Sequence, residues 1–232
     1  GGAPQEGGPP PGPPSPSCGS GAVRTEVVIP ESLPHPGAGT SFVDGAFDDS
    51  FLERLYQLWL SLPRAPKEKA SPTERSYFAD VEGWLTRRID AAAAAAGLTG
   101  PAETLHRVRF LCYTEPGGSL PAHVDLARTE RGLRSTHTFL LYLTDCSEGG
   151  ETTFLECLDG DAALAHSGGV APGPRATVAK VTPRRGRLLL MPHACPHSAA
   201  PVVHVPKVLV RGELLTGGGG DADTAGRAVA RE

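Results

Sequence analysis

The chain has 232 residues, of which 22 are lysine or arginine and 26 are aspartate or glutamate, so its formal charge is −4. This balance disfavours a protein that binds nucleic acid through bulk positive charge, and no run approaches the roughly 18 apolar residues that would cross a bilayer. Glycine (29 residues) and proline (23 residues) are in excess, mainly near the chain ends.

Both ends of the chain are predicted to be disordered tails. Residues 1–22 contain seven glycines and seven prolines and offer almost nothing to bury, so they cannot offset the entropy lost on ordering. Residues 216–232, with a run of glycine at 217–220, have the same character. Between them we expect one domain, with an N-terminal strand and packing helices in 23–105 and a β-rich core in 106–215.

The cysteines and the N-terminal sequence indicate where the protein resides. The five cysteines are odd in number and form no CxxC motif, which favours free thiols in a reducing compartment over a disulfide framework. The N-terminal stretch has neither the basic nor the apolar region of a secretory signal, although an upstream segment could have been removed. We expect a cytoplasmic or nuclear protein, with no membrane partner; its oligomeric state is open.

The segment from 51 to 62 is predicted to be a helix. Asp48, Asp49 or Ser50 can cap its start, and Pro63 can stop it. Its apolar residues fall on one helical face: Phe51, Leu52, Leu55, Leu58, Trp59 and Leu62.

A second helix is predicted from about Pro72 to Ala96, ending at Gly97. Six alanines at 91–96 have the best helix propensity, and glycine commonly follows the last helical turn. The apolar residues that keep a helical period in this stretch are Tyr77, Phe78, Val81, Trp84, Leu85 and Ile89.

After Leu105 the sequence changes to short β-rich runs separated by glycine, proline and acidic residues. The runs are RVRFLCY, THTFLLYL, ETTFL, ATVAKV, GRLLLM and PVVHVPKVLVRGELL. Many short strands without helices between them favour a sandwich or barrel over a parallel sheet. The predicted fold class is therefore α+β, dominated by a β-barrel.

His123 and Asp125, in PAHVDL, are the first candidate metal ligands. They stand two residues apart, so on an extended backbone both side chains point to the same face and can bind one ion. Taken alone the pair is equally compatible with a polar strand end. Further residues are needed to favour a metal.

His197 and Lys207 supply that evidence. His197 begins a new β segment 72 residues after Asp125, and Lys207 follows ten residues later in a run made otherwise mainly of valine, leucine and proline. A lysine in an apolar strand is costly unless an anion such as a bound carboxylate neutralises it. Two imidazoles and one carboxylate form the facial triad of non-haem Fe(II) oxygenases.

From Val108 to Leu215 the chain resembles the 2-oxoglutarate- and Fe(II)-dependent dioxygenases, specifically the prolyl 4-hydroxylase-like branch. The matching pieces, in the family's order, are FLCYTEPGGSLPAHVD, STHTFLLYLTDCSEGGETTFL, GRLLLMPH and HSAAPVVHVPKVLVRGELL. The resemblance implies a double-stranded β-helix, or jelly roll. It also implies an enzyme that uses Fe(II), 2-oxoglutarate and dioxygen, with ascorbate as a further requirement in such families.

The resemblance implies a role for each matching site residue. His123, Asp125 and His197 would bind Fe(II), and Lys207 would pair with the distal carboxylate of 2-oxoglutarate. Tyr142 would share that carboxylate, and Tyr113 would line the same pocket. For both tyrosines the alternative is an aromatic side chain that fills the barrel interior.

Several neighbouring residues compete for these roles. His193, His204 and Cys195 could each replace His197, but position +10 from His193 is Val203 and +10 from His204 is Leu214, neither of which binds a carboxylate. We expect His193 to be a strand-end residue or to lie behind the ligands, and Cys195 to be small and buried. Arg211 is an alternative carboxylate partner to Lys207.

Other polar residues remain without an assigned role. His35 and His106 are expected to be structural, and His137 should lie on the opposite strand face from Tyr142. The loop after Asp125 carries Arg128, Arg131 and Arg134, which could recognise an acidic group, help to close a lid, or simply be solvated. Residues 157–176 are expected to form a surface insertion.

The leading functional prediction is a hydroxylase of a peptidyl residue, with proline as the first candidate, that gives succinate and CO2. The intact Asp125 disfavours halogenation, because halogenating relatives replace this carboxylate. The alternatives are the same chemistry on a small metabolite or a nucleobase, a cupin-like metal enzyme without 2-oxoglutarate, and a non-catalytic peptide-binding jelly roll. Nucleic acid is an unfavoured partner because of the net charge; a protein, peptide or small molecule is the expected substrate.

Overall fold

The computed structural model describes residues 22–66, 73–98, 103–130, 133–158 and 176–215. Apart from residue 22, both predicted tails lie outside the described residues, as do Arg131, Cys18 and nearly all of the predicted insertion at 157–176. Neither helix in the described ranges has the length and apolar character that a membrane span requires.

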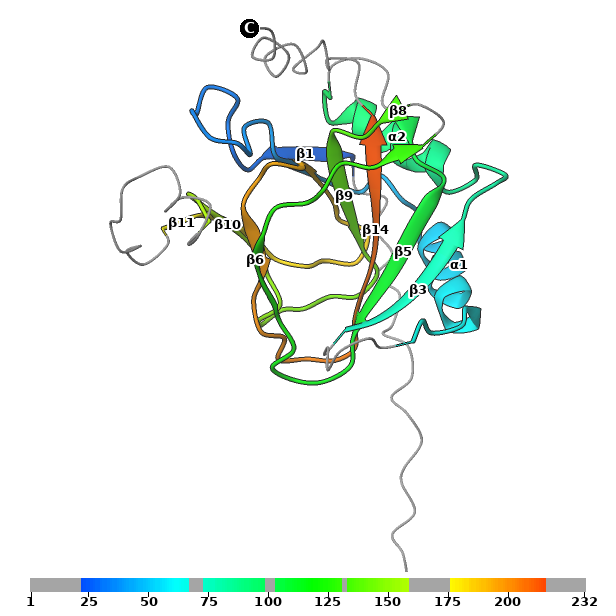
Figure 1. The fold of residues 1–232 in the computed structure, drawn as a ribbon. Helices are drawn as coiled ribbons and strands as arrows, with labels where there is room; N and C mark the ends of the chain where they lie inside the picture. The colour runs from blue at the N-terminus through cyan, green and yellow to red at the C-terminus, as the bar shows by residue number, and fades with distance from the viewer. Residues whose placement is uncertain (1–21, 67–72, 99–102, 131–132, 159–175, 216–232) are drawn as a thin grey trace, which may run out of the picture.

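The chain forms two facing antiparallel sheets (Figure 1). The larger sheet has the order β1-β2-β12-β9-β14-β5-β3, with β4 paired to β14, and the smaller has the order β11-β10-β13-β6. The strands of the larger sheet are β1 (Arg24–Val27), β2 (Ser41–Asp44), β3 (Thr73–Ala79), β4 (Glu103–Thr104), β5 (Arg107–Tyr113), β9 (His137–Tyr142), β12 (Leu188–Pro192) and β14 (Lys207–Leu215). Those of the smaller sheet are β6 (Leu120–His123), β10 (Thr152–Leu155), β11 (Thr177–Val181) and β13 (His197–Ala199). A short pair, β7 (Thr129–Glu130) and β8 (Leu133–Arg134), follows β6.

This architecture confirms the predicted α+β jelly roll. Strands occur in all six β-rich runs, although residues 201–206 of the last run precede β14 instead of forming part of it. In Figure 1, β6 and β10 lie across the barrel from β5 and β14. The two sheets therefore enclose an interior into which alternate residues of each strand point.

Helix α1 (Asp49–Ser61) forms as its sequence predicts. The Asp48 carboxylate caps it by accepting a hydrogen bond from the Phe51 backbone N–H, at 2.9 Å. Its apolar residues, including Leu55 and Trp59, are buried against the larger sheet. The helix ends at Ser61, two residues before Pro63.

The predicted helix from 72 to 96 is wrong in its first half. Residues 73–79 form β3, which pairs with β5 along its whole length, and only Thr86–Ala95 forms a helix, α2. The apparent helical period was a coincidence, because Tyr77 is 56% exposed and Val81 is 83% exposed. The ladder of hydrogen bonds to β5 outweighed local propensity. Gly97, with φ of 81°, follows the end of α2 as predicted.

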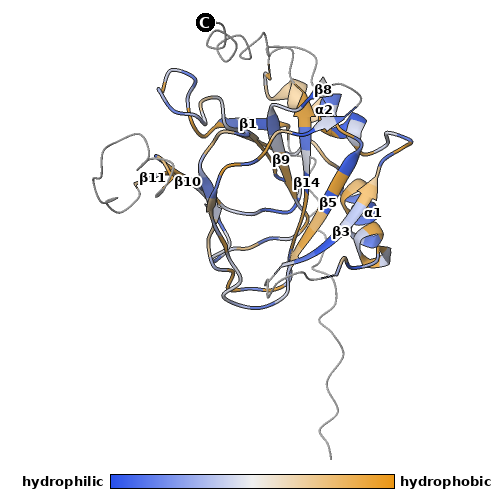
Figure 2. Cartoon of the chain, in the orientation of Figure 1, coloured by the Kyte–Doolittle hydropathy of each residue, from blue (hydrophilic) through white to orange (hydrophobic). Residues whose placement is uncertain are grey.

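The two faces of the larger sheet bury different residue sets. One face packs Phe139, Leu141 and Val210 against the helices, whereas the other presents Leu140, Tyr142 and neighbouring side chains to the barrel interior. This follows from the two-residue period of strands, and Figure 2 shows hydrophilic and hydrophobic residues alternating over the first part of β5. Polar side chains on the interior face are therefore held inside the barrel.

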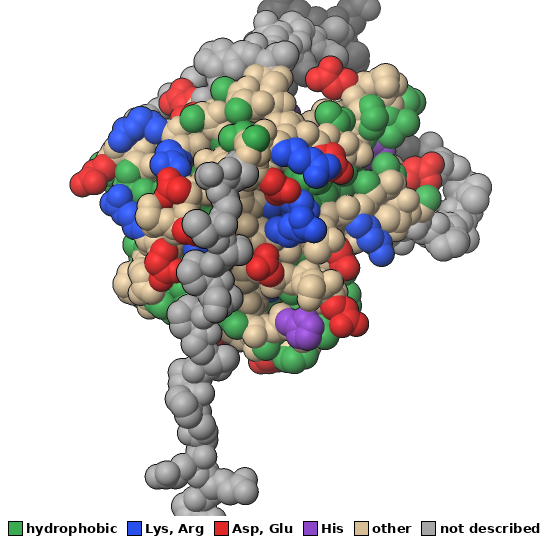
Figure 3. All heavy atoms as spheres, turned by 180° about the vertical axis from the view of Figure 1, so that it is seen from behind, with side chains coloured by type: hydrophobic (Ala, Val, Ile, Leu, Met, Phe, Trp, Pro, Cys, Tyr) green, Lys and Arg blue, Asp and Glu red, His purple; other side chains and the backbone are tan. Residues whose placement is uncertain are grey.

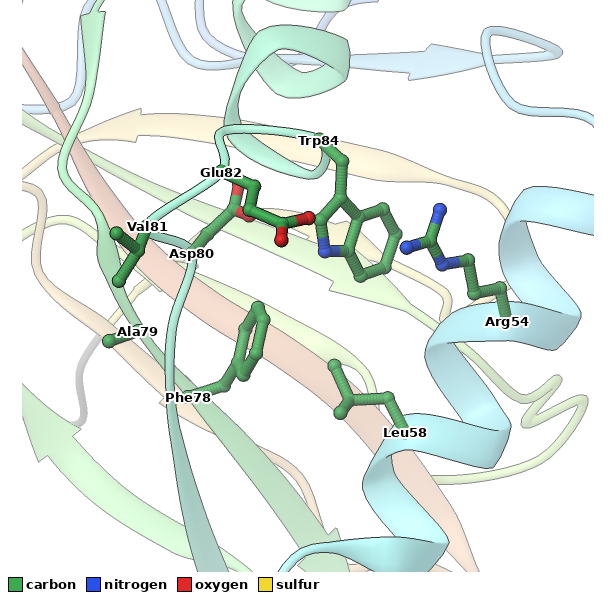
Figure 4. A pocket seen from close by; sticks show the side chains of 8 residues that line it. All are labelled: Arg54, Leu58, Phe78, Ala79, Asp80, Val81, Glu82 and Trp84. Atoms are coloured by element: carbon green, nitrogen blue, oxygen red, sulfur yellow. The ribbon is translucent and has the colours of Figure 1, made fainter.

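A surface pocket of about 350 Å³ lies between α1 and the turn that joins β3 to α2 (Figure 4). Phe78 and Trp84 form its apolar wall, and the Arg54 guanidinium lies over the Trp84 ring, 3.8 Å from the ring centroid. Neither the predicted metal ligands nor Lys207 line this pocket. It is separate from the predicted reaction site.

Candidate metal centre and co-substrate pocket

The three predicted metal ligands meet at one place in the smaller sheet. His123 ends β6, His197 begins β13, and these two residues are direct cross-strand partners. Asp125 follows β6 by two residues, where its backbone N–H donates to the His193 carbonyl at 2.9 Å. One ligand atom from each of His123, Asp125 and His197 lies within 4.8 Å of the others.

Both histidines present the same ring nitrogen to this centre. His123 Nδ1 lies 2.9 Å from the Pro121 carbonyl oxygen, and His197 Nδ1 lies 2.9 Å from the Cys195 carbonyl oxygen. Because a carbonyl can only accept, each Nδ1 carries the proton, and each Nε2 keeps its lone pair for a metal. The backbone therefore fixes the tautomer that a metal site needs.

The separations of the donor atoms fit one ion. His123 Nε2 lies 3.7 Å from Asp125 Oδ1, and His197 Nε2 lies 3.9 Å from Asp125 Oδ2. Two ligand atoms bound about 2 Å from one metal are at most about 4 Å apart. Burial, followed by the charge of His123, lowers the pKa of His197, which favours the neutral imidazole that binds metals. Two imidazoles and one carboxylate match the donor set of non-haem Fe(II).

The Asp125 carboxylate is held from two sides. Its Oδ1 forms an ion pair with Arg211 Nη2 at 2.7 Å, and its Oδ2 accepts a hydrogen bond from the Thr138 hydroxyl at 2.6 Å. Arg211 therefore pairs with a proposed metal ligand and with Glu213. Because both of its contacts are already carboxylates, Lys207 is favoured over Arg211 as the partner of a further carboxylate.

His193 lies behind Asp125, in agreement with its expected place behind the ligands. Its Nδ1 is 2.9 Å from the Thr138 hydroxyl, and its Nε2 is 2.7 Å from the Ser135 hydroxyl. Since Thr138 gives its single proton to Asp125, His193 Nδ1 must donate to Thr138, and Nε2 of the neutral ring accepts from Ser135. Burial lowers the pKa of His193, which is consistent with this neutral form. The chain of hydrogen bonds orients the carboxylate toward the histidines.

Lys207 is a buried cation without a carboxylate partner among the described residues. It is 1% exposed, and its Nζ donates to the Gly150 carbonyl at 2.6 Å. Burial lowers its pKa to about 8, although Cys146 and Glu151 act in the opposite direction. Because no carboxylate neutralises the buried ammonium group of Lys207, this position is suited to bind an anion.

The two predicted tyrosines surround Lys207. The Lys207 Nζ lies 4.7 Å from the centroid of the Tyr113 ring and 6.0 Å from that of Tyr142. The Tyr142 hydroxyl shares a hydrogen bond of 2.7 Å with Thr152 Oγ1. Burial raises the pKa of both tyrosines, so their hydroxyls stay protonated and can donate. The structure brings the three predicted co-substrate residues together.

The glycine pair in GGETTF allows this packing. Gly149 and Gly150 both have φ of 70°, a left-handed conformation that favours glycine. A Cβ on Gly149 would lie 2.4 Å from the Pro201 carbonyl oxygen, and one on Gly150 would lie 3.3 Å from Lys207 Cδ. The turn therefore needs glycine to approach β14 and the loop before it.

The remaining histidines and cysteines take other positions. His204 is exposed, and Cys195 is fully buried, as expected for a small core residue. His137 Nδ1 lies 2.9 Å from the Thr136 hydroxyl oxygen, and burial lowers the pKa of His137 to about 4. His35 and His106 contact backbone carbonyls, of Leu155 and Asp80 respectively.

Thr138, Ser135 and Glu213 are site residues that the sequence reasoning missed. Thr138 shares a strand face with Tyr142, four residues along β9, and Glu213 shares one with Lys207 and Arg211 on β14. Extending the two-residue period from the predicted residues could have found these two. Ser135 precedes β9, so no strand period points to it.

The family comparison agrees with this geometry. Residues 108–212 match the model of the 2OG-Fe(II) oxygenase superfamily, and this range contains the three proposed ligands and Lys207. Over these residues the chain is therefore similar to the 2OG-Fe(II) oxygenase superfamily. No curated protein matches the sequence of the chain.

Several solved structures share the fold of this chain. HygX from Streptomyces hygroscopicus, with nickel and 2-oxoglutarate bound, has a TM-score of 0.52 and 15% identity and covers 77% of this chain and 83% of its own. A viral collagen prolyl hydroxylase from Paramecium bursaria Chlorella virus-1, in complex with 2-oxoglutarate, has a TM-score of 0.51 and 16% identity, with 78% and 98% covered. A Trichoplax adhaerens prolyl hydroxylase in complex with a hypoxia-inducible factor peptide has a TM-score of 0.51 and 16% identity, and the match covers 75% of this chain and 83% of that one.

Proposed function

We propose that this protein is an Fe(II)- and 2-oxoglutarate-dependent dioxygenase that hydroxylates a C–H bond of its substrate. The observation that carries the proposal is Lys207, a buried cation without a carboxylate partner in the described chain, inside the barrel that holds the His-Asp-His triad. A metal enzyme that did not use a dicarboxylate would leave this lysine unexplained. The cupin-like alternative is disfavoured for that reason.

His123, Asp125 and His197 would hold the ferrous ion. Once bound, iron and 2-oxoglutarate would supply the oxidation, with dioxygen consumed as 2-oxoglutarate becomes succinate and CO2 and the substrate gains a hydroxyl group. The task of the protein is to keep both Nε2 atoms and the carboxylate aimed at one point. The backbone carbonyls behind the histidines and the Thr138 hydroxyl behind Asp125 support this task.

Lys207, Tyr113 and Tyr142 would bind the distal carboxylate of 2-oxoglutarate. The ammonium group would form an ion pair, and the protonated phenols could add hydrogen bonds. Desolvation strengthens such a pair because water cannot compete for the charges. A peptide-binding module without catalysis would need neither this cation nor the triad, so the catalytic reading is favoured.

A peptidyl residue, with proline first, is the proposed substrate. Support comes from the prolyl 4-hydroxylase-like motifs and from the fold shared with two prolyl hydroxylases. Figure 3 shows acidic and basic side chains interspersed on the face it displays, without a continuous basic surface for a nucleic-acid backbone. The four described cysteines are free thiols, which supports a reducing compartment such as the cytoplasm or nucleus.

Product analysis tests the proposed function. The purified protein, supplied with Fe(II), 2-oxoglutarate and air, is incubated with a library of proline-containing peptides, and succinate and peptides gaining one oxygen atom are measured by mass spectrometry. We expect succinate from the intact protein and almost none from Asp125→Ala. Succinate formation that is equal in both proteins would contradict the proposed site.

A further inference from the structure

We propose that Arg109 and Arg128 form an anion subsite, so that the substrate carries a carboxylate group close to the carbon that is oxidised. The inference rests on the proposed function and adds the chemical class of the substrate. It is carried by a cluster of arginines beside the proposed metal centre. Arg211 supports the proposed metal ligand Asp125, but nothing in the proposed chemistry of iron or 2-oxoglutarate requires Arg109 or Arg128.

Three guanidinium groups meet at one buried carboxylate oxygen. Glu213 is 2% exposed, and its Oε1 accepts hydrogen bonds from Arg211 Nη1 at 2.6 Å and from Arg109 Nη2 at 3.3 Å. The same oxygen forms an ion pair with Arg128 Nε at 3.2 Å. Such convergence holds like charges close together. The mutual repulsion of these guanidinium groups falls when further negative charge is close to them.

The cluster adjoins the metal centre directly. Arg211, which contacts Glu213, also forms an ion pair with Asp125 Oδ1 at 2.7 Å. Arg109 on β5 is the direct cross-strand partner of Arg211 on β14, and Arg128 follows Asp125 by three residues. Three different segments of the chain therefore deliver guanidinium groups to one side of the triad.

The charges in the cluster do not balance. Three arginines face two carboxylates, Asp125 and Glu213, which leaves one positive charge uncompensated. The proposed cofactors do not remove it, because the two charges of Fe(II) are matched by those of 2-oxoglutarate and Lys207 adds another cation. This local excess contrasts with the formal charge of −4 on the whole chain. An anionic substrate group would neutralise it.

Arg109 and Arg128 have donors left for a ligand. A guanidinium has five N–H donors, and each of these two side chains makes its only ion pair within the described residues through one nitrogen, to Glu213. Their side chains are 21% and 54% exposed, whereas that of Arg211 is 11% exposed and held by both carboxylates. Arg211 would thus stay bound to Asp125 and Glu213, and the guanidinium groups of Arg109 and Arg128 would be accessible to a carboxylate of the substrate.

A purely structural role predicts different behaviour. Arg211, at 2.6 Å, already neutralises Glu213, so the longer contacts of Arg109 and Arg128 are not needed to keep that carboxylate buried. Removing either long contact should leave Glu213 paired and the protein folded. The two roles can therefore be separated by ligand binding in folded variants.

The test compares acids with their uncharged amides. The full chain, loaded with Mn(II) and saturated with 2-oxoglutarate, is titrated by calorimetry with the N-acetylated amino acids and their amides. A second arm uses the blocked tripeptide Ala-Pro-Asp and its Ala-Pro-Asn counterpart. Binding in the first arm would indicate a small-molecule substrate with a carboxylate, and binding in the second would indicate an acidic peptide substrate. Saturation with 2-oxoglutarate is verified first, in the same samples.

We expect at least one acid to bind about tenfold or more tightly than its amide. In Arg109→Gln combined with Arg128→Gln this preference should fall to nearly one, and Arg109→Lys should restore part of it when Arg128 is intact. Arg184→Gln removes the same charge from an exposed side chain that makes no hydrogen bond or ion pair in the described chain, and should keep the full preference.

Three results would overturn the inference: acids and amides that bind alike, a preference that survives in the double variant, or no acid binding by protein that binds 2-oxoglutarate. Failure of the proposed function would look different. The protein would then not bind 2-oxoglutarate at all, whereas the acid-to-amide ratio could still be measured on the Mn(II)-loaded form.

Discussion

Replacing Lys207 with methionine should affect stability and co-substrate binding in opposite directions. In the protein without ligands, Lys207 is 1% exposed, and its positive charge is stabilised only partly, by Cys146 and Glu151. A pKa lowered from 10.5 to about 8 corresponds to a cost of about 3 kcal/mol at neutral pH. Methionine removes this cost but also removes the hydrogen bond to the Gly150 carbonyl, a loss of about 1 kcal/mol. Lys207→Met should therefore raise the free energy of unfolding by about 2 kcal/mol.

The pH dependence supplies a second check on the same residue. Because the folded pKa of Lys207 lies below the unfolded value, the cost is fully present below about pH 8, where both states are charged. As the pH rises from about 8 toward 10.5, the folded protein loses the proton while the unfolded chain keeps it, so the wild type gains stability relative to the variant. The advantage of Lys207→Met should shrink across that window.

Binding of 2-oxoglutarate should respond in the reverse sense. Removing one partner of a buried ion pair costs at least about 2 kcal/mol, which weakens binding by about 30-fold or more. Urea unfolding of the metal-free protein from pH 7 to 10 and titration of the metal-loaded protein measure the two effects. Lys180→Met, at an exposed lysine of β11, is the control and should change neither by much. A less stable Lys207→Met, or one that binds 2-oxoglutarate normally, would refute the reasoning.

Two further substitutions test how the site is held. Thr138→Val removes the hydroxyl that donates to Asp125 at 2.6 Å, so metal affinity, measured by Co(II) titration, should fall by about tenfold or more while the fold persists; unchanged affinity would show that Thr138 does not orient the carboxylate. Gly150→Ala places a Cβ at φ of 70° and 3.3 Å from Lys207 Cδ, and should cost about 1–3 kcal/mol of folding free energy in thermal or urea unfolding. A Gly150→Ala variant as stable as the wild type would contradict the claim that this turn requires glycine.

The sequence predicted the elements that its periodicity determines well. Helix α1 shows both a buried stripe and a capping aspartate, and the β-rich runs after Leu105 each contain a strand. It misassigned 73–79, because a strand at the sheet edge with exposed Tyr77 lacks a clean two-residue pattern. Pairing with β5, a long-range contact, determined the outcome there, and local sequence does not encode such a contact.

The candidate site was predictable where residues stand at characteristic spacings. His123 and Asp125 are close in sequence, and Lys207 is a single lysine in an apolar run, so the sequence alone identifies these three residues as candidates. The contacts of Arg211 and Glu213 could not be anticipated, since they depend on which strands become neighbours and on the register between β14 and β5. The same applies to His193, whose role is defined by hydroxyls on a different strand and loop.

The most direct test of the central claim is an anaerobic titration of the Fe(II)-loaded protein with 2-oxoglutarate, monitored in the visible range for the metal-to-ligand charge-transfer absorption. We expect a saturable band in the intact protein, none in His123→Ala, and a band in Lys207→Ala that needs far more 2-oxoglutarate. Absence of the band from intact protein with iron shown to be bound would contradict the account, because triad and lysine would then not act on one co-substrate.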